Sequence, residues 1–575
     1  MKILLLHPED AFAREYLIRR WDLVVDLGRA PRGTYEDWRD QAGCPVVSIY
    51  DYAEEIDDLH YLRDLLRLGL GHVVDQWGID WWDIFSLEIA SGIQRAVLIE
   101  RLAKELPLNC ELYSTRADFV AIALERLLAG RVTCLGSRMQ SMGHRLRRHY
   151  ETVSQLGGSE LLQLFEDIFD ADHSIRRRFA PRKRNLGKPV VLVPSAYVNV
   201  TRTALAYAGM LPNHQFLLVV ARRSGYPAST PPNVMAASLT PYFGAIDKDE
   251  LASLRESWER LKTWLIGRAP EFKTAVSAGF FGSGNAPFRW GLALRDAWLR
   301  VFASAHVTAC LSADDSNPNT RIPLIIAKKR GIPALACHHG ALDFRMAIKV
   351  NHADAYLAKS ELELDYLKRI CRFPAEKISI AAPPSSTLRH AISGAPQWLV
   401  FFTEPYRGYG WRTDEVYGDL LPRLFCLAQN CGLKLVFKLH PFESLKGHRR
   451  MLRRLIPEHE HQIEVLAGPP TDQLWNNASF ALTVQSSTAL ECTALGIPVF
   501  LCAWLRDSYT GYVQQYARFG TGHILDSAEQ IADIPRLLEK HKKSSHQRAS
   551  SAVIDTRDFA QLLAGTCSLP LVSSA

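Results

Sequence analysis

The sequence lacks any long hydrophobic run. Its first apolar stretch, Ile3 to Leu6, is followed almost at once by a proline and two acidic residues. A signal peptide needs about 7–15 consecutive apolar residues, and a membrane-spanning helix needs about 20. The sequence therefore predicts neither of these segments, and it indicates a cytoplasmic protein, with peripheral attachment at the inner membrane left open.

A cysteine framework and a strong excess of charge are also missing. The 11 cysteines are odd in number and form no C-x-x-C pair, which indicates reduced thiols and no zinc site. The formal net charge of +7 is small for 575 residues. This argues against a dedicated nucleic-acid-binding protein, and it permits an anionic ligand or an anionic membrane surface.

The length exceeds what one hydrophobic core supports, and it predicts about three domains. Hydrophobic residues at 47% and charged residues at 22% are ordinary globular proportions. We expect these segments: an amino-terminal α/β domain with a helical extension (1–171), a basic linker (172–188), two Rossmann-like domains (189–394 and 395–545) and a loosely packed tail (546–575).

The amino-terminal segment alternates strand and helix signals, with strands expected at Lys2 to Leu6, Leu23 to Gly28, Pro45 to Asp51 and Glu111 to Thr115. An aromatic cluster follows the first three strands. It can line a sugar-binding surface or pack between helices, and packing is the favoured interpretation because tryptophans bury large areas wherever they lie. Its members are Trp77, Trp81, Trp82 and Phe85.

Two basic stretches interrupt the globular pattern. The linker between Asp172 and Lys188 is rich in arginine and lysine, and Lys446 to Ile456 has the pattern of a basic amphipathic helix. Both can be solvated surface, and both can also attract anionic lipid headgroups.

Two series of short, apolar strands separated by helical segments fill the rest of the chain, as buried parallel sheets require. We therefore predict an α/β fold with two doubly wound Rossmann-like domains facing a cleft, in addition to the amino-terminal α/β domain. The expected strands begin at Val190, Phe216, His306, Pro333, Ala355 and Ile378 in the first series, and at Trp398, Leu433, Ile463, Phe480, Pro498 and His523 in the second.

Polar residues follow many of these strands directly. Open parallel sheets bind ligands outside the carboxyl ends of their strands. Five such positions are difficult to explain as coincidence, and they indicate a site on each sheet. The residues are Asp314 and Asp315, His338 with His339 and Gly340, Glu404, His440, and Ser486 with Ser487.

The second series contains the strongest local pattern. The strand LKLVFKLHP ends at His440-Pro441, and FALTVQSSTALECTALGIPV passes from a strand through Ser486, Ser487 and Thr488 into a helix. A helix N-terminus attracts anions such as a nucleotide phosphate. The alternative is purely local, because Thr488-x-x-Glu491 also matches a capping box.

These motifs resemble the His-Pro and Ser-Ser/Thr motifs of bacterial GT-B glycosyltransferases that build surface polysaccharides from CMP-activated sialic acid or Kdo. The stretch from Asp314 through Arg321 to Gly340 similarly resembles a segment of capsule and lipopolysaccharide transferases and of CDP-glycerol glycerophosphotransferase relatives. The resemblance covers about Pro189 to Leu538. It implies a GT-B-like fold and transfer of a sugar from a nucleotide-activated donor, with CMP-sugar favoured, to a surface polysaccharide or lipid-linked glycan acceptor.

The resemblance also implies roles for single residues. His440, Lys438 and the hydroxyls of Ser486, Ser487 and Thr488 bind the donor phosphate, together with Glu404, while Glu491 binds the ribose hydroxyls. Asp314 or Asp315 is the general base, with His339 as the competing candidate. On the acceptor side lie His338, Gly340 and Arg321.

The same resemblance implies no bound metal and no cofactor, because GT-B enzymes offset the charge of the leaving group with side chains and a helix dipole. A metal-binding D-x-D motif is absent at Asp314, since Ser316 occupies its third position. Other functions stay open: transfer of a polyol phosphate from a CDP donor, 2-epimerisation of a nucleotide sugar, and a non-catalytic scaffold role in polysaccharide biosynthesis.

Overall fold

The computed structural model describes residues 1–8, 13–115, 119–135, 186–222, 225–282, 284–340, 342, 344–383, 396–406, 410–441, 443–506, 512–544 and 554–565. Most of the predicted basic linker (172–185) lies outside these residues. In the part that is described, no helix is long and apolar enough to cross a membrane.

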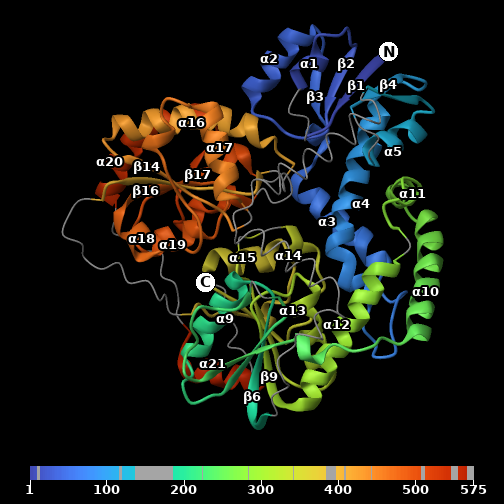
Figure 1. Cartoon of the computed structure of the whole chain (residues 1–575), viewed down its shortest axis with the longest axis vertical. Helices are drawn as coiled ribbons and strands as arrows, with labels where there is room; N and C mark the ends of the chain where they lie inside the picture. The colour runs from blue at the N-terminus through green and yellow to red at the C-terminus, as the bar shows by residue number, and fades with distance from the viewer. Residues whose placement is uncertain are drawn as a thin grey trace.

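Three parallel sheets organise the chain (Figure 1). The amino-terminal sheet has the order β3-β2-β1-β4-β5, the middle sheet β12-β11-β10-β9-β6-β7-β8, and the carboxy-terminal sheet β15-β14-β13-β16-β17-β18. In each sheet the chain starts at a central strand, builds outward on one side and then on the other. This is the doubly wound order, whose ligand crevice lies where the direction reverses.

The strands are short and mostly buried, as continuous apolar runs such as FLLVV in β7 and WLVFF in β13 require. Their bounds are β1 Lys2–Leu6, β2 Leu23–Asp26, β3 Val46–Ser48, β4 Glu111–Ser114, β5 Arg131–Cys134, β6 Leu186–Ser195, β7 Phe216–Val220, β8 Val234–Ser238, β9 Ala305–Ser312, β10 Ala334–Cys337, β11 Ala355–Ala358, β12 Ile378–Ile380, β13 Trp398–Phe402, β14 Lys434–Lys438, β15 Glu464–Leu466, β16 Ala478–Thr483, β17 Val499–Cys502 and β18 His523–Leu525.

The helices cover the sheet faces and the spaces between the three units (Figure 1). Their bounds are α1 Ala13–Leu17, α2 Arg32–Ala42, α3 Glu55–Leu68, α4 Trp81–Glu105, α5 Phe119–Leu127, α9 Val198–Gly209, α10 Lys248–Ile266, α11 Pro270–Ser277, α12 Asn285–Ser304, α13 Pro318–Lys329, α14 Phe344–Ile348, α15 Glu361–Arg369, α16 Thr413–Asn430, α17 Leu445–Leu455, α18 Asp472–Asn477, α19 Thr488–Ala494, α20 Ile534–Ser544 and α21 Thr556–Leu563.

Helix α4 joins the amino-terminal unit to the middle unit. Its N-cap is Asp80, whose carboxylate accepts the backbone N–H groups of Trp82 and Asp83. Trp81 and Trp82 are fully buried, and the Trp82 ring stacks on Phe281 of the middle unit at 6.1 Å. The packing interpretation of the aromatic cluster is thereby confirmed for these two tryptophans.

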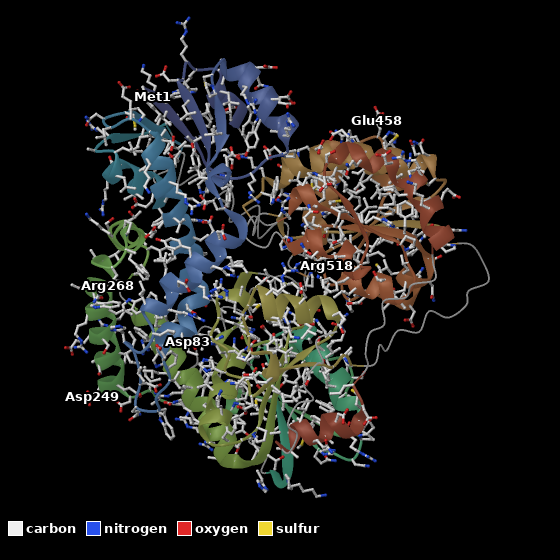
Figure 2. The ribbon with its side chains drawn as sticks, turned by 180° about the vertical axis from the view of Figure 1, so that it is seen from behind. Met1, Asp83, Asp249, Arg268, Glu458 and Arg518 are labelled. Atoms are coloured by element: carbon white, nitrogen blue, oxygen red, sulfur yellow. The ribbon has the colours of Figure 1, made fainter. Side chains whose placement is uncertain are left out.

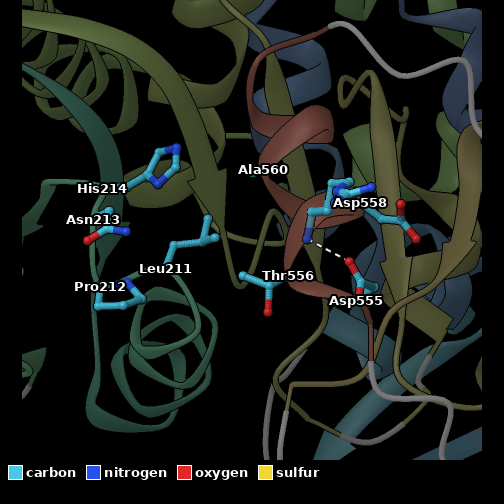
Figure 3. Close-up of a pocket in the computed structure, with 9 residues that line it drawn as sticks. Leu211, Pro212, Asn213, His214, Asp555, Thr556, Asp558 and Ala560 are labelled. Carbon is cyan, nitrogen blue, oxygen red and sulfur yellow. Dashed lines mark hydrogen bonds between the residues drawn. The ribbon is translucent and has the colours of Figure 1, made fainter.

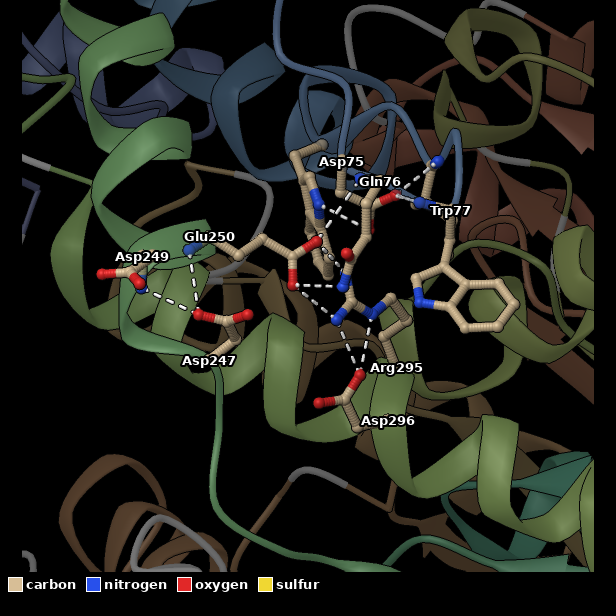
Figure 4. A network of polar contacts seen from close by, with 10 residues as sticks. Asp75, Gln76, Trp77, Asp247, Asp249, Glu250, Arg295 and Asp296 are labelled. Carbon is tan, nitrogen blue, oxygen red and sulfur yellow. Dashed lines mark hydrogen bonds and ion pairs between the residues drawn. The ribbon is translucent and has the colours of Figure 1, made fainter.

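A buried ionic network holds the loop before α4 against two helices of the middle unit (Figure 4). Arg295 of α12 donates to Asp75 at 2.8 Å and to both oxygens of Glu250 in α10, at 2.6 and 2.8 Å. Its neighbour Asp296 accepts a further bond at 2.7 Å. Although burial opposes the charge, these carboxylates raise the pKa of Arg295, so the guanidinium stays ionised.

The segment 554–565 corrects the expectation of a loosely packed tail. Helix α21 lies against the middle unit, although the whole carboxy-terminal sheet separates the two in the sequence (Figure 1). Phe559 is fully buried and packs on Tyr207 of α9 at 5.4 Å. The apolar face of α21 therefore completes the core of the middle sheet.

Two strands were not predicted, and one begins early. β5 and β8 lie at sheet edges and are only four and five residues long, and β8 contains a single β-branched residue, so their sequences give a weak strand signal. β6 begins at Leu186, inside the predicted linker, because Leu186 pairs with Ala305. The twelve strands predicted after residue 189 are all present, although several of them are shorter than predicted.

Candidate functional site

The middle sheet places a tyrosine and a carboxylate at its switch point. Tyr197 follows β6 and Asp314 follows the adjacent strand β9, so both lie at the carboxyl edge where the strand order reverses. The Tyr197 hydroxyl donates to Asp314 Oδ2 at 2.5 Å, Asn317 Nδ2 donates to the same oxygen at 2.6 Å, and the Ser316 N–H donates to Oδ1 at 2.8 Å. Asp314 is thus a fixed, almost completely buried carboxylate.

His338 and His339 lie beside Asp314, at the end of the neighbouring strand β10. Tyr197 packs edge-on against the His339 ring at 5.1 Å. Burial lowers the pKa of His339, although Asp314 opposes the shift, so the ring is neutral near pH 7. Burial works against ionisation of Asp314, but His339, His338 and the hydrogen bonds to its oxygens together lower its pKa. The pair is therefore an ionised carboxylate beside a neutral imidazole.

Asp315 and Arg321 are turned away from this edge. The Asp315 carboxylate forms a buried ion pair with Lys349. Arg321 is 1% exposed, donates to Asp83 of α4 at 2.7 Å, and binds the backbone oxygens of Asp315 and Val350. Asp83, labelled in Figure 2 where α4 meets the middle unit, also contacts His352 at 2.6 Å. Both predicted residues are therefore buried, and their charges are paired within the protein.

The His-Pro turn after β14 is held through its backbone. The His440 N–H donates to Thr403 Oγ1 at 2.9 Å and to Glu443 Oε2 at 3.1 Å. The Tyr417 hydroxyl donates to the other Glu443 oxygen at 3.4 Å. These bonds fix the main chain at the turn that carries the imidazole.

Lys438 and His440 place basic groups at this edge. Burial, and after it the charge of Arg202, lowers the pKa of Lys438 to about 8. Burial, then Lys438, and then His339 lower the pKa of His440 to about 4. At pH 7 the site therefore has a protonated amine beside a neutral imidazole.

The turn between β16 and α19 does not form the capping box that its sequence permits. The helix begins at Thr488, its N-cap Ser487 makes no side-chain cap, and the Thr488 N–H is bound by Ser486 Oγ at 3.3 Å. Thr488 Oγ1 has no hydrogen-bond partner among the described residues. Glu491 turns outward to Arg202. With seven residues α19 is short, so its dipole adds little to the charges of the lysine and arginine.

Glu404 follows β13, at the switch point of the carboxy-terminal sheet. Its side chain is buried. Burial raises the pKa of Tyr516, and the charge of Glu404 raises it further. The Tyr516 hydroxyl donates to Gln485 O at 3.3 Å. Since β13 lies between β14 and β16, the residues predicted to bind the nucleotide-activated donor span about two strand spacings, roughly 10 Å.

The carboxyl edges of the two doubly wound sheets meet. Arg202, on α9 of the middle unit, lies 3.8 Å from Glu491 on α19 of the carboxy-terminal unit. The same arginine lowers the pKa of Lys438, and His339 of the middle unit lowers the pKa of His440. Residues that were predicted on separate sheets are therefore brought to one place, and the predicted fold class is confirmed.

One group of side chains has the composition of a metal site. Single donor atoms of Asp314, His338 and His339 all lie within 4.8 Å of one another. Lys359 and Lys349 also act on His338, and burial together with His339 and these lysines lowers its pKa. Positive charges this close disfavour a divalent cation, although the donor atoms themselves suit one.

Several residues of the site were not predicted. Tyr197 stands at a strand end, where the reasoning applied to Asp314 would have found it. Arg202 and Glu443 carry no such signal, because a helix position and a loop acid become informative only through contacts across the fold.

A separate hollow of about 790 Å³ lies away from these residues (Figure 3). It is formed where the loop before β7, including His214, faces the first turn of α21, including Asp555 and Asp558. Since this loop precedes its strand, the hollow opens at the amino ends of the middle sheet, opposite the candidate site.

Comparisons with known proteins identify no family for this chain. No family model matches the sequence, and neither does any curated protein. Similar solved structures include the UDP-GlcNAc 2-epimerase from Methanocaldococcus jannaschii (10% identity, 64% of this chain and 94% of that chain, TM-score 0.36), the wall teichoic acid polymerase TagF (10%, 72% and 96%, 0.38) and the calicheamicin glycosyltransferase CalG4 (11%, 66% and 94%, 0.35). With such low TM-scores, these likenesses carry no argument about activity.

Proposed function

We propose that this protein is a glycosyltransferase that moves a sugar from a nucleotide-activated donor, a CMP-sugar in the first place, to a surface polysaccharide or lipid-linked glycan acceptor. The observation that supports this best is that polar residues at the strand ends of the middle sheet lie close to polar residues at the strand ends of the carboxy-terminal sheet. Lys438 and the neutral imidazole of His440 lie at the rim of the carboxy-terminal sheet, and Arg202 of α9 approaches them from the middle unit. The middle unit also supplies His339, a neutral histidine beside the ionised carboxylate of Asp314.

The donor is bound by the carboxy-terminal unit in this proposal. Lys438 and Arg202 neutralise the phosphate, and the unpartnered hydroxyl of Thr488, together with Ser486 and Ser487, donates hydrogen bonds to its oxygens. His440 donates a hydrogen bond to the bridging oxygen as the bond between that oxygen and the anomeric carbon breaks. Glu491 and Glu404 accept hydrogen bonds from the nucleoside.

The acceptor hydroxyl is activated from the middle unit. Its oxygen attacks the anomeric carbon while His339 takes its proton, and Asp314 stabilises the imidazolium that results. This assigns the base to His339 rather than to either aspartate. Asp314 has a lowered pKa and its oxygens are already hydrogen-bonded, so it is a weak base. Asp315 is held by Lys349.

The reaction is proposed to need no metal, since Lys438 and Arg202 supply the charge that a cation otherwise provides. Undiminished turnover in excess EDTA is the expected result. Loss of turnover that is restored by a divalent cation would instead assign the cluster of Asp314, His338 and His339 to metal binding.

A nucleotide screen tests the function. At a hundred times its dissociation constant, a bound nucleotide should stabilise the protein by about 2.7 kcal/mol, visible as a rise in Tm. We expect CMP to give the largest rise among CMP, CDP, UDP and GDP. Lys438→Met should reduce this rise strongly at the same nucleotide concentration, and Lys446→Met, at an exposed position, should not. A protein that binds none of the four is the non-catalytic scaffold, and consumption of a CDP-polyol would indicate the phosphotransferase.

The pH dependence of nucleotide binding follows from Lys438. Only the protonated amine attracts phosphate, and with a pKa of about 8 its charged fraction falls as the pH rises through that value. Between pH 7 and pH 9 the Kd for CMP should therefore rise about tenfold. The phosphate itself stays ionised throughout, since its second pKa is about 6. Lys438→Met should bind weakly with a flat profile, and a flat profile in the wild type contradicts the role.

The site of action remains part of this proposal. We place the protein in the cytoplasm, at the inner face of the membrane, where the basic face of α17 would meet anionic lipid. Arg449 and Arg450 are exposed on that face, whereas Arg453 and Arg454 contact Glu460 and Asp414. Sedimentation with anionic vesicles at low salt, and its loss at high salt, would support the placement.

A further inference from the structure

A second pocket lies where the amino-terminal unit meets the carboxy-terminal unit. Its volume is about 200 Å³. One wall comes from the residues after β2 and β3, including Arg29 and Tyr50, and the other comes from Trp411 before α16 and Trp504 after β17. Both walls therefore stand at the carboxyl ends of parallel strands or in the loops that follow them, where α/β sheets bind ligands.

The junction that forms this pocket is fixed. Arg412 and Asp26 form an ion pair at 2.7 Å, with both side chains almost completely buried. The Arg412 N–H donates to Arg29 O at 2.7 Å, and the Arg29 N–H donates to Gly410 O at 2.8 Å. Gly410 has φ +80°, and a Cβ there would lie 2.4 Å from the Tyr50 hydroxyl, so this approach requires glycine. The walls are thus held before any ligand arrives.

Arg29 gives the pocket a positive charge. Its guanidinium lies over the rings of Tyr50, at 4.6 Å, and Trp411, at 5.3 Å. It donates to Arg506 O at 3.1 Å, and no carboxylate lies within ion-pair distance of it in the described part of the chain. A guanidinium held flat by two rings presents its remaining N–H groups in a plane that matches a carboxylate.

The aromatic wall contains unsatisfied donors. The indole nitrogens of Trp411 and Trp504 have no hydrogen-bond partner among the described residues, although Trp411 is buried. An indole N–H can only donate, and buried donors without a partner are rare. Neighbouring atoms cover both nitrogens in this structure, so a ligand oxygen reaches them when an indole shifts within the wall.

Asp51 adds an acceptor at the opposite side of the lining. One of its oxygens accepts the Ser48 N–H at 2.8 Å. Its charge disfavours a phosphate dianion, and its second oxygen suits a hydroxyl group. The lining therefore combines flat aromatic faces, one guanidinium, indole donors and a carboxylate acceptor, a set that matches a hydroxylated ring with a single negative charge.

We propose that this pocket binds one sugar residue that carries a carboxylate, of the uronic acid type. The volume is below the roughly 300 Å³ at which pockets for drug-sized ligands begin, and it admits a single ring but not a nucleotide. The carboxylate lies against Arg29, and the ring packs on the aromatic wall. This assignment of the sugar rests on the proposed function: the sugar is an earlier residue of an acidic glycan acceptor.

The test compares two sugars that differ only at the charged group. The binding of D-glucuronate and of D-glucose to the full-length protein is measured by calorimetry and ligand-observed NMR. We expect glucuronate to bind at least tenfold more tightly than glucose. Arg29→Met should remove that preference. Arg32→Met makes the same change three residues along the chain, where the side chain is exposed, and should leave it intact.

Other results separate this proposal from the transferase. Equal binding of glucuronate and glucose, tight binding of acetate, or an unchanged preference in Arg29→Met would overturn the acidic-sugar pocket, whatever the activity. Trp504→Phe, which keeps a ring and removes the N–H, should weaken glucuronate binding without changing Tm, and it provides a second test if Arg29→Met fails to fold. Glucuronate binding in a protein that binds no nucleotide would retain the pocket and discard the transferase.

Discussion

His440→Ala is expected to reduce kcat by about 10²- to 10³-fold, the usual cost of removing one hydrogen-bond donor that stabilises developing negative charge. Burial, Lys438 and His339 keep the imidazole neutral at pH 7, so it acts as a neutral hydrogen-bond donor, and its bond strengthens as the leaving phosphate develops charge. Steady-state turnover of a CMP-sugar, measured by nucleotide release, reports the loss.

The fold of this variant should be unaffected. The bonds that hold the turn come from the His440 backbone, to Thr403 and Glu443, and alanine keeps both. An unchanged Tm confirms that the variant is folded, and His461→Ala, at an exposed position of the same unit, serves as the matched control. Near-normal turnover in His440→Ala would remove this residue from the chemistry.

His339→Ala should cause a loss of similar size through the other half of the site, because the acceptor hydroxyl then has no base. In the wild type, kcat/KM should fall on the acid side as His339 becomes protonated. Since its pKa is lowered, that fall should begin below the ordinary histidine value of about 6.5. The acid limb should be absent in His339→Ala, and a retained limb would assign it to another group.

The two aspartates separate support of the base from support of the fold. Asp314→Asn should reduce kcat severely with little change in KM, because it removes the charge that stabilises protonated His339. Asp315→Asn should instead lower stability by about 3–5 kcal/mol, since it leaves Lys349 buried without its partner, while the folded fraction stays active. The reverse pattern would return the base to Asp315.

The sequence predicts the positions of most strands well in this protein, and it also marks their carboxyl ends, because both follow from local pattern. Apolar runs mark the strands, and a polar residue directly after a run marks the carboxyl edge, as at Asp314 and His440. These features depend only on neighbours in the chain and on the rule that parallel sheets bind ligands at that edge.

The sequence pattern does not show which residues from distant parts of the chain contact one another in the fold. The sequence alone permits Arg321 to be a substrate-binding cation, whereas in the structure its charge is paired with that of Asp83, 238 residues earlier. Asp26 and Arg412, 386 residues apart, likewise give no sign that they join two units. The capping box at Thr488 does not form, because the helix already begins at Thr488 and its N-cap is Ser487, while Glu491 pairs with Arg202 of another unit.

The return of α21 to the middle unit affects the order in which the units can mature during synthesis. The carboxy-terminal sheet is translated entirely between β12 and α21, so it can collapse on the ribosome while its neighbour still exposes the groove that Phe559 fills. The middle unit closes last, after the chain has been made as far as residue 563.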